Sequence, residues 1–317
     1  MRLSKRWLPA LMCLLCSVPA AAQTSGYASG FDVSTAQDSL YRINLESGVA
    51  TRIGPLGFLD VEGLAVHPDG TLYGAVDGTS VQGGGSDLLI RINTETGAGT
   101  FAAALSGLAG LGPGLGGQLD YGLAATCDGR LWLSSDTLGH LWEVNRQDGS
   151  LRRVVQAGPK LSGLAASGNF LYGLALDTED SLYRIDTQTL AVTRIGGLGL
   201  PSRIYDAGLD FDASGRLWAT LDYLTPPDGA QLVLRNDIAE LDPLSGAILR
   251  RYPITGAGSG LNTTQMEGLA IAPPSCEDRG TPGVGSAPKP VPLDSPLALL
   301  LAALALGGVG MLRLARR

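Results

Sequence analysis

Five acidic side chains of the sequence stand directly before or within a recurring Gly-Leu motif. Clustered carboxylates repel one another, and a hard cation such as Ca²⁺ relieves that repulsion by taking oxygen ligands. If the fold brings these side chains together, they predict a cation site. The alternative is that each one only caps a loop or a strand end. The candidate ligands are Asp60, Glu62, Asp120, Asp206 and Glu267.

A second acidic set recurs at the end of an aromatic segment in successive repeats. A carboxylate at this place can accept hydrogen bonds from backbone amides of a tight turn. We therefore expect a structural role for this set, which consists of Asp32, Asp77, Asp136, Asp177 and Asp222.

Other chemistry has little support in the sequence. The chain has two histidines, His67 and His140, and neither has a partner at the spacing of a zinc site or a Ser-His-Asp triad. The sequence therefore predicts no catalytic residue. Residues 102–119 and 224–236 depart furthest from the repeat, and such loops can carry recognition.

Repeated strands must position the two acidic sets. The motif Gly-Leu-Ala, or Gly-Leu-Asp in one copy, begins at Gly63, Gly122, Gly163, Gly208 and Gly268. A turn and an aromatic strand ending in aspartate follow most copies. A third strand of the type Leu-Tyr-Arg-Ile-Asn and a plain fourth strand complete the unit. Four short antiparallel strands in a repeat of this length are typical of β-propellers.

The two ends of the repeat region predict how the ring closes. The last copy, Gly268 to Pro274, supplies one strand, whereas residues 27–53 supply three. We therefore expect an all-β fold, a single β-propeller over residues 23–274 with five four-stranded blades, in which one C-terminal strand completes a blade with three N-terminal strands. A degenerate sixth blade is the alternative. Such closure removes an open sheet edge.

The strand order within the unit resembles that of NHL, YVTN and gluconolactonase-type propellers. The resemblance covers about residues 26–274 and rests on structural motifs, so it implies the fold and not an activity. By analogy with the gluconolactonase type, it offers a calcium-dependent hydrolase or lactonase that uses the channel-mouth carboxylates as an alternative function. That family's sites also use Asn, and no Asn stands at the inner-strand positions identified above.

Both ends of the chain carry segments typical of export. Residues 1–22 have a basic start, an apolar stretch and the small residues Ala20 to Ala22, which predicts a signal peptide cleaved between Ala22 and Gln23. Residues 275–295 form a Pro/Gly/Ser-rich linker. Residues 296–312 are uncharged and just long enough to cross a bilayer as a transmembrane helix, and the arginines of 313–317 should stay in the cytoplasm.

The end of the linker resembles a bacterial sorting tail of the IPTL-CTERM type, close to the PEP-CTERM class. The resemblance rests on the hydrophobic helix, the arginine-rich end and the stretch Val291, Pro292, Leu293, Asp294, Ser295 and Pro296. It implies recognition by a sorting transpeptidase in the membrane. We therefore expect export through the inner membrane, anchoring by the helix, and a cell-surface or extracellular location after processing.

Charge and cysteine content narrow the function further. Without its two end segments the chain keeps 17 basic and 30 acidic side chains, a net charge of −13. Such acidity argues against nucleic acid as a partner. The two cysteines outside the signal segment, Cys127 and Cys276, are either free or bridged, which depends on the fold. We expect a non-catalytic binding or scaffold module with an unknown surface or matrix ligand, and Ca²⁺ is the only cofactor that the sequence indicates.

Overall fold

The computed structural model describes residues 24–32, 35–77, 87–106, 119–155, 158–225, 233–256 and 265–276. All of them belong to the first of two units, Met1–Glu277. The predicted signal peptide, sorting motif and C-terminal helix, and most of the linker, lie outside the described residues. None of the described segments is a helix long and apolar enough to span a membrane.

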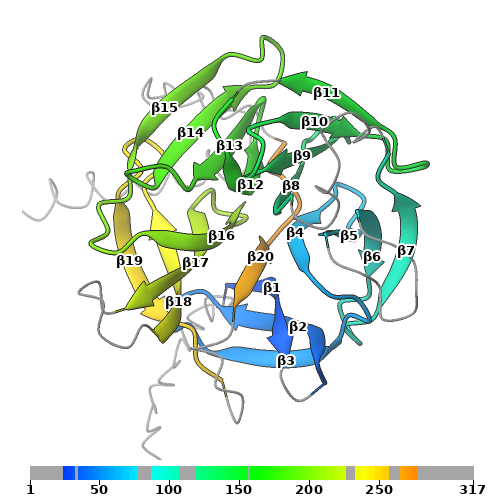
Figure 1. The fold of residues 1–317 in the computed structure, drawn as a ribbon, viewed down its shortest axis with the longest axis horizontal. Coiled ribbons are helices and arrows are strands. Elements are labelled where there is room, and N and C mark those ends of the chain that lie inside the picture. Colours follow the sequence, from blue (N-terminus) through cyan, green and yellow to red (C-terminus); the bar gives the residue numbers. More distant parts are fainter. Residues whose placement is uncertain are drawn as a thin grey trace, which may run out of the picture. The chain divides into compact units, whose positions relative to one another are not determined.

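Twenty strands form five antiparallel sheets arranged as a ring (Figure 1). This confirms the predicted five-bladed propeller. From inner to outer strand, the blades are blade 1, β20 (Met266–Ala270), β1 (Ser25–Asp32), β2 (Gln37–Asn44) and β3 (Ala50–Pro55); blade 2, β4 (Val61–Val66), β5 (Leu72–Val76), β6 (Leu88–Ile92) and β7 (Gly99–Ala104); blade 3, β8 (Tyr121–Ala125), β9 (Leu131–Ser135), β10 (Leu141–Val144) and β11 (Leu151–Val155); blade 4, β12 (Leu161–Ser167), β13 (Phe170–Ala175), β14 (Ser181–Asp186) and β15 (Val192–Gly197); and blade 5, β16 (Ile204–Phe211), β17 (Leu217–Thr225), β18 (Val233–Leu241) and β19 (Ile248–Pro253).

Ring closure also follows the prediction. The C-terminal strand β20 pairs antiparallel with the N-terminal strand β1, with Tyr27 opposite Ala270 and Ala28 opposite Leu269. Blade 1 is therefore built from the two ends of the propeller region.

The glycines of the repeated motif explain how the hub is packed. A methyl group added to Gly268 would overlap the carbonyl oxygen of Glu62, and one added to Gly122 would overlap that of Ser162. Gly63, Gly163 and Gly208 face the next inner strand in the same way. Each inner strand thus lies against the backbone of the next one around the ring. The cavity left between them measures about 10 Å³, room for one water molecule at most.

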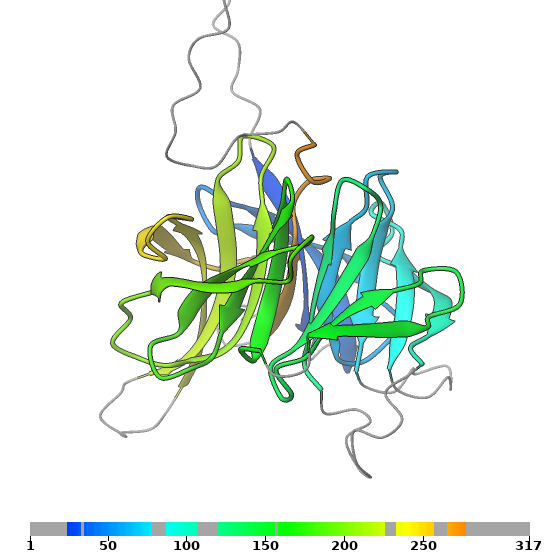
Figure 2. The ribbon, with the colours of Figure 1, turned by 90° about the horizontal axis from the view of Figure 1, so that it is seen from above.

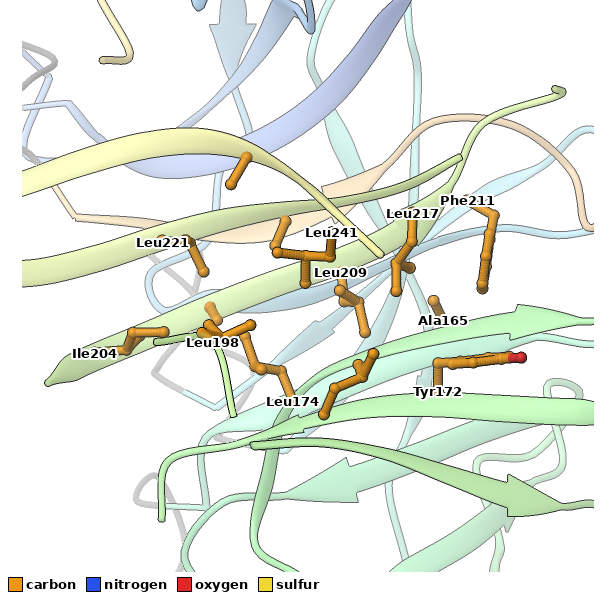
Figure 3. Close-up of a cluster of buried hydrophobic side chains, with 14 residues drawn as sticks. Ala165, Tyr172, Leu174, Leu198, Ile204, Leu209, Phe211, Leu217, Leu221 and Leu241 are labelled. Atoms are coloured by element: carbon orange, nitrogen blue, oxygen red, sulfur yellow. The ribbon is translucent and has the colours of Figure 1, made fainter. Parts of the chain in front are cut away.

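Apolar layers between neighbouring blades form the core. Between blades 4 and 5, Leu174 and Leu182 pack against Leu209, Leu217 and Leu221, all at most 1% exposed (Figure 3). The five inner strands run from one face of the ring to the other (Figure 2). We call the face where they begin the acidic face and the face where they end the cysteine face.

Candidate functional site

The acidic face gathers the ends of two strands from every blade. In blade 2, Val61 at the beginning of β4 pairs with Val76 at the end of β5. Asp60 and Asp120 precede β4 and β8 with left-handed φ values of 60° and 45°, a conformation that aspartate tolerates better than most residues. Both side chains are exposed. The topology therefore brings both predicted acidic sets to one end of the hub.

Three carboxylates from two blades meet at this end. Glu62 on β4, Asp77 after β5 and Asp120 before β8 each place an oxygen within 4.8 Å of the others. Protein oxygens bind Ca²⁺ at about 2.3–2.6 Å, so three oxygens around one ion lie at most about 5 Å apart. The separations fit one shared divalent cation. We call these three residues the carboxylate trio.

Backbone amides of blade 3 hold two members of the trio in place. Glu62 Oε2 accepts a hydrogen bond from the Tyr121 N–H. Asp77 Oδ2 accepts bonds from the N–H groups of Leu119, at 2.5 Å, and Asp120, at 3.1 Å. The trio therefore bridges blades 2 and 3.

The second oxygen of Asp77 is the most informative atom of the site. Asp77 is fully buried, and its Oδ1 has no hydrogen-bond partner among the described residues. A buried carboxylate oxygen without a partner is costly, since nothing replaces its lost hydration. A cation bound between the three carboxylates would supply that partner.

Burial and mutual repulsion raise the pKa values around the trio. Burial raises the pKa of Glu62 well above its usual value, and its bond to Asp120 and the charge of Glu267 add to the rise. Burial also raises the pKa of Asp77 to about 7, although its backbone bonds act in the opposite direction. Low-dielectric surroundings disfavour the charged form of a carboxyl group in this way.

More carboxyl groups surround the trio and extend the same effect. Burial raises the pKa of Asp206 to about 6, of Asp38 to about 7 and of Asp136 to about 8, and it also raises the pKa of Asp222 and Glu267. Within the described residues, no arginine, lysine or histidine forms an ion pair with any of these groups or with the trio. The acidic cluster comprises the trio together with Asp38, Asp60, Asp136, Asp206, Asp222 and Glu267.

The structure therefore joins only two of the five predicted ligands into a candidate cation site. Glu62 and Asp120 belong to the trio, whereas Asp60, Asp206 and Glu267 lie elsewhere in the acidic cluster. Asp206 instead accepts hydrogen bonds from Ser162 Oγ, at 2.6 Å, and from the Ala207 N–H, at 2.7 Å.

The second acidic set divides into two groups. Asp32 pairs with Arg52 at 2.6 Å, and Asp177 accepts bonds from Ser181 Oγ and Tyr183 Oη, so these two remain within their own blades. Asp77 and Asp222 instead reach the next blade, where Asp222 Oδ2 accepts the Met266 N–H at 2.8 Å. Asp136 lies beside Asp120 and bonds Thr137.

A third recurring acidic position lies outside the two predicted sets. Asp38, Asp87 and Asp180 each stand two residues before the repeated Leu of a third strand. Asp38 accepts the Val61 N–H at 2.7 Å, Asp180 accepts the Ile204 N–H at 3.1 Å, and Asp87 accepts the Tyr121 hydroxyl at 2.8 Å. Each bond joins one blade to the next, and the spacing within the repeat is the signal that identifies them.

The two histidines have structural surroundings. His67 is buried, and its Nε2 lies 3.1 Å from the Gly129 carbonyl of the next blade. His140 packs edge-on against Trp142. These contacts give neither ring a nucleophile or metal ligand to activate.

The two cysteines lie on the cysteine face, away from the carboxylate trio. Cys127 follows β8 in blade 3, and Cys276 follows β20 in blade 1. They form a disulfide, with their Cα atoms 5.3 Å apart.

A surface pocket of about 510 Å³ lies beside the beginning of β16. Pro201, Arg203, Tyr205 and Leu224 contribute to its lining, and Tyr205 is 59% exposed. Its size falls in the range of small-molecule sites, about 300–1,000 Å³. It is a second place on the described part of the molecule with room for a ligand.

Comparisons with known proteins agree with the repeat and the fold. A family described as "Repeat of unknown function (DUF6923)" matches residues 63–215. No curated protein matches the chain. These findings assign no activity.

Several solved structures share a similar arrangement. A chain of a nidogen/laminin complex is 14% identical with a TM-score of 0.47, over 80% of this chain and 100% of that chain. A Bacteroides ovatus xyloglucan-locus protein, GH43B, is 14% identical with a TM-score of 0.49, over 73% of this chain and 55% of that one. A calcium-binding protein, regucalcin, from Agrobacterium tumefaciens is 18% identical with a TM-score of 0.41, over 78% of each chain.

Proposed function

We propose that the chain is an exported β-propeller that acts as a non-catalytic binding module at the cell surface or in the extracellular matrix, and that its carboxylate trio binds Ca²⁺. The observation that carries the cation site is the buried, partnerless Oδ1 of Asp77 beside two further carboxylates. Three carboxylates offer up to six oxygens, and water can complete the six to eight ligands of Ca²⁺.

The position of the site suits a binding role. The trio lies at the hub end of the acidic face, where the narrow hub blocks passage through the ring. A cation there would join blades 2 and 3 through Glu62, Asp77 and Asp120. It would also replace repulsion between carboxylates with attraction to a common charge. The pocket beside Tyr205 offers space for an organic ligand.

Delivery to the surface rests on the two end segments of the sequence. The signal peptide would direct export, and the sorting tail would present the propeller to a membrane transpeptidase. Mass spectrometry of the exported product tests this part, with Gln23 as its first residue and loss of the C-terminal helix as the expected result. A product outside the cell that still ends at Arg317 would refute processing.

Calorimetric titration of the mature protein with CaCl₂ tests the cation site. We expect the wild type to release or absorb heat and to melt at a higher temperature with Ca²⁺. Glu62→Gln, Asp77→Asn and Asp120→Asn should each weaken binding at least about tenfold, since each removes a charged ligand. Asp177→Asn is the matched control, because Asp177 holds the equivalent repeat position but lies outside the acidic cluster. No heat and no melting shift with the wild type would refute the site.

One observation favours a calcium-dependent hydrolase or lactonase as a second candidate. Asp136, whose pKa burial raises to about 8, lies beside Asp120 of the trio. A carboxyl group that keeps its proton at neutral pH can act as a general acid near a bound metal. Lactone hydrolysis that requires Ca²⁺ and disappears in Asp136→Asn would support this function, and turnover no faster than the buffer blank would exclude it for the lactones tested.

A further inference from the structure

The segment that follows β20 crosses the end of the hub on the cysteine face. Ala272 and Pro274 line a small cavity together with Val66, Ala125 and Ala166, which belong to the ends of three inner strands. That cavity measures only about 10 Å³, so the segment covers this end of the hub. Figure 2 shows the segment, in orange, emerging at this face. We call residues 271–276 the strap.

Blade 5 holds the beginning of the strap. Asp210 Oδ2 accepts a hydrogen bond from the Ile271 N–H at 2.6 Å. Asp210 occupies the motif position that is alanine in the other four copies, after Gly63, Gly122, Gly163 and Gly268. The one departure from the Gly-Leu-Ala motif therefore coincides with the one place where the chain must be turned across the hub.

Blade 3 holds the end of the strap through the Cys127–Cys276 disulfide. The strap thus begins in blade 1, is held by blade 5 and ends covalently on blade 3. Two steps around the ring separate blade 1 from blade 3, and the disulfide spans 149 residues of sequence. Cys276 is exposed, whereas Cys127 is half-buried, so a reducing thiol would reach the Cys276 sulfur more readily.

The strand that the strap extends is the weak point of the ring. β20 is the one strand that joins its blade without a chain connection to its neighbour, and its ladder with β1 is irregular between Ala28 and Gly30. Strands held mainly by local hydrogen bonds open with lower free energy than the whole domain. β20 also carries Glu267 of the acidic cluster, so detachment at one end would disturb the acidic face at the other.

We propose that the strap is a covalent lock on ring closure, and that reduction of Cys127–Cys276 frees β20 while blades 2 to 5 stay folded. The reductant would be a dithiol. Its first thiolate attacks the Cys276 sulfur to form a mixed disulfide and releases the Cys127 thiolate, and its second thiolate then displaces the Cys276 thiolate. Two electrons pass to the protein, the two cysteines take up protons as thiols, and the dithiol becomes a disulfide.

Hydrogen exchange followed by mass spectrometry on the mature protein, before and after reduction with dithiothreitol, tests this lock. We expect peptides covering residues 266–270 and 25–32 to exchange at least about tenfold faster after reduction, with the peptides of β12–β15 unchanged. Trapping both thiols with iodoacetamide confirms complete reduction. The Cys127→Ser/Cys276→Ser variant should match the reduced wild type, and the reduced wild type alone suffices if that variant does not fold.

A second variant separates the strap from the disulfide. Asp210→Asn keeps the size of the side chain and the disulfide but removes the carboxylate that holds Ile271. We expect faster exchange confined to the strap and the end of β20. Unchanged protection of residues 266–270 after reduction would overturn the lock, as would equal acceleration in all five blades or two free thiols in the exported protein. All measurements are made in a Ca²⁺ chelator, so the result is independent of the cation site.

Discussion

Replacing Asp77 by asparagine separates the cost of the carboxylate trio from its use. Burial raises the pKa of Asp77 from 3.8 to about 7 in the folded protein. An acid whose folded pKa is raised contributes no penalty below pH 3.8, and the folded state loses stability as the pH rises from there to about 7. At about 1.4 kcal/mol per pH unit, the upper limit of this loss is about 4 kcal/mol.

The amide introduced by Asp77→Asn cannot ionise, so the variant should avoid this loss. The substitution also weakens the charge-assisted bonds to the N–H groups of Leu119 and Asp120, which costs about 1 kcal/mol. At pH 8 without metal, we therefore expect Asp77→Asn to be more stable than the wild type by about 2–3 kcal/mol, or about 5–10 °C in melting temperature. At pH 4 the two proteins should melt together. With Ca²⁺ at about 100 times its dissociation constant, the wild type should gain about 2.7 kcal/mol and the variant nothing.

Thermal and urea unfolding between pH 4 and pH 8, with a chelator or with CaCl₂, measures these differences. Asp177→Asn is a control of opposite sign. Burial acts to raise the pKa of Asp177, but bonds from Glu179, Ser181 and Tyr183 outweigh it and hold the pKa below its usual value. That variant should therefore lose stability at pH 8. If Asp77→Asn melts below the wild type at pH 8 in chelator, the account of the trio is wrong.

Three further variants test the ring itself. Gly268→Ala should cost about 2–3 kcal/mol in urea unfolding because its methyl group would overlap the Glu62 carbonyl oxygen, whereas Gly168→Ala, with open space around it and a φ of 57°, should cost about 1 kcal/mol; equal costs would argue against close packing at the hub. Asp180→Ala should cost about 1–3 kcal/mol because it leaves the buried Ile204 N–H without its acceptor, and an unchanged urea midpoint would contradict a bond between blades 4 and 5. Trp218→Phe removes the indole N–H that bonds Asp212 at 3.1 Å and should cost about 1 kcal/mol, which a midpoint within error of the wild type would disprove.

The repeat made most of the fold predictable from sequence. Strand identity, blade number and ring closure all follow from the order of the motifs, because each copy repeats the same alternation of buried and exposed positions. The same reasoning placed both acidic sets on one face, since β4 must begin where β5 ends.

The composition of the trio was less accessible. Asp77 shares its repeat position with Asp32 and Asp177, so a repeat-based interpretation assigns all three the same structural role. Their environments differ because Arg52 neutralises Asp32 and hydroxyl groups satisfy Asp177, whereas Asp77 faces Glu62 and the beginning of blade 3. Contacts across blades depend on distances in space that the order of residues within one repeat does not encode.

The glycines of the hub also set where this architecture can change over time. Because Gly63, Gly122, Gly163, Gly208 and Gly268 each fit against the backbone of the next inner strand, the five contacts form a closed circle with no slack. A duplicated or deleted blade would have to refit every member of that circle at once. The outer strands carry no such constraint: Arg152 on β11 is exposed and bonds only Glu143 of the neighbouring strand. We expect related sequences to vary at the rim and in the loops, and to keep both the number of blades and a glycine at each hub position.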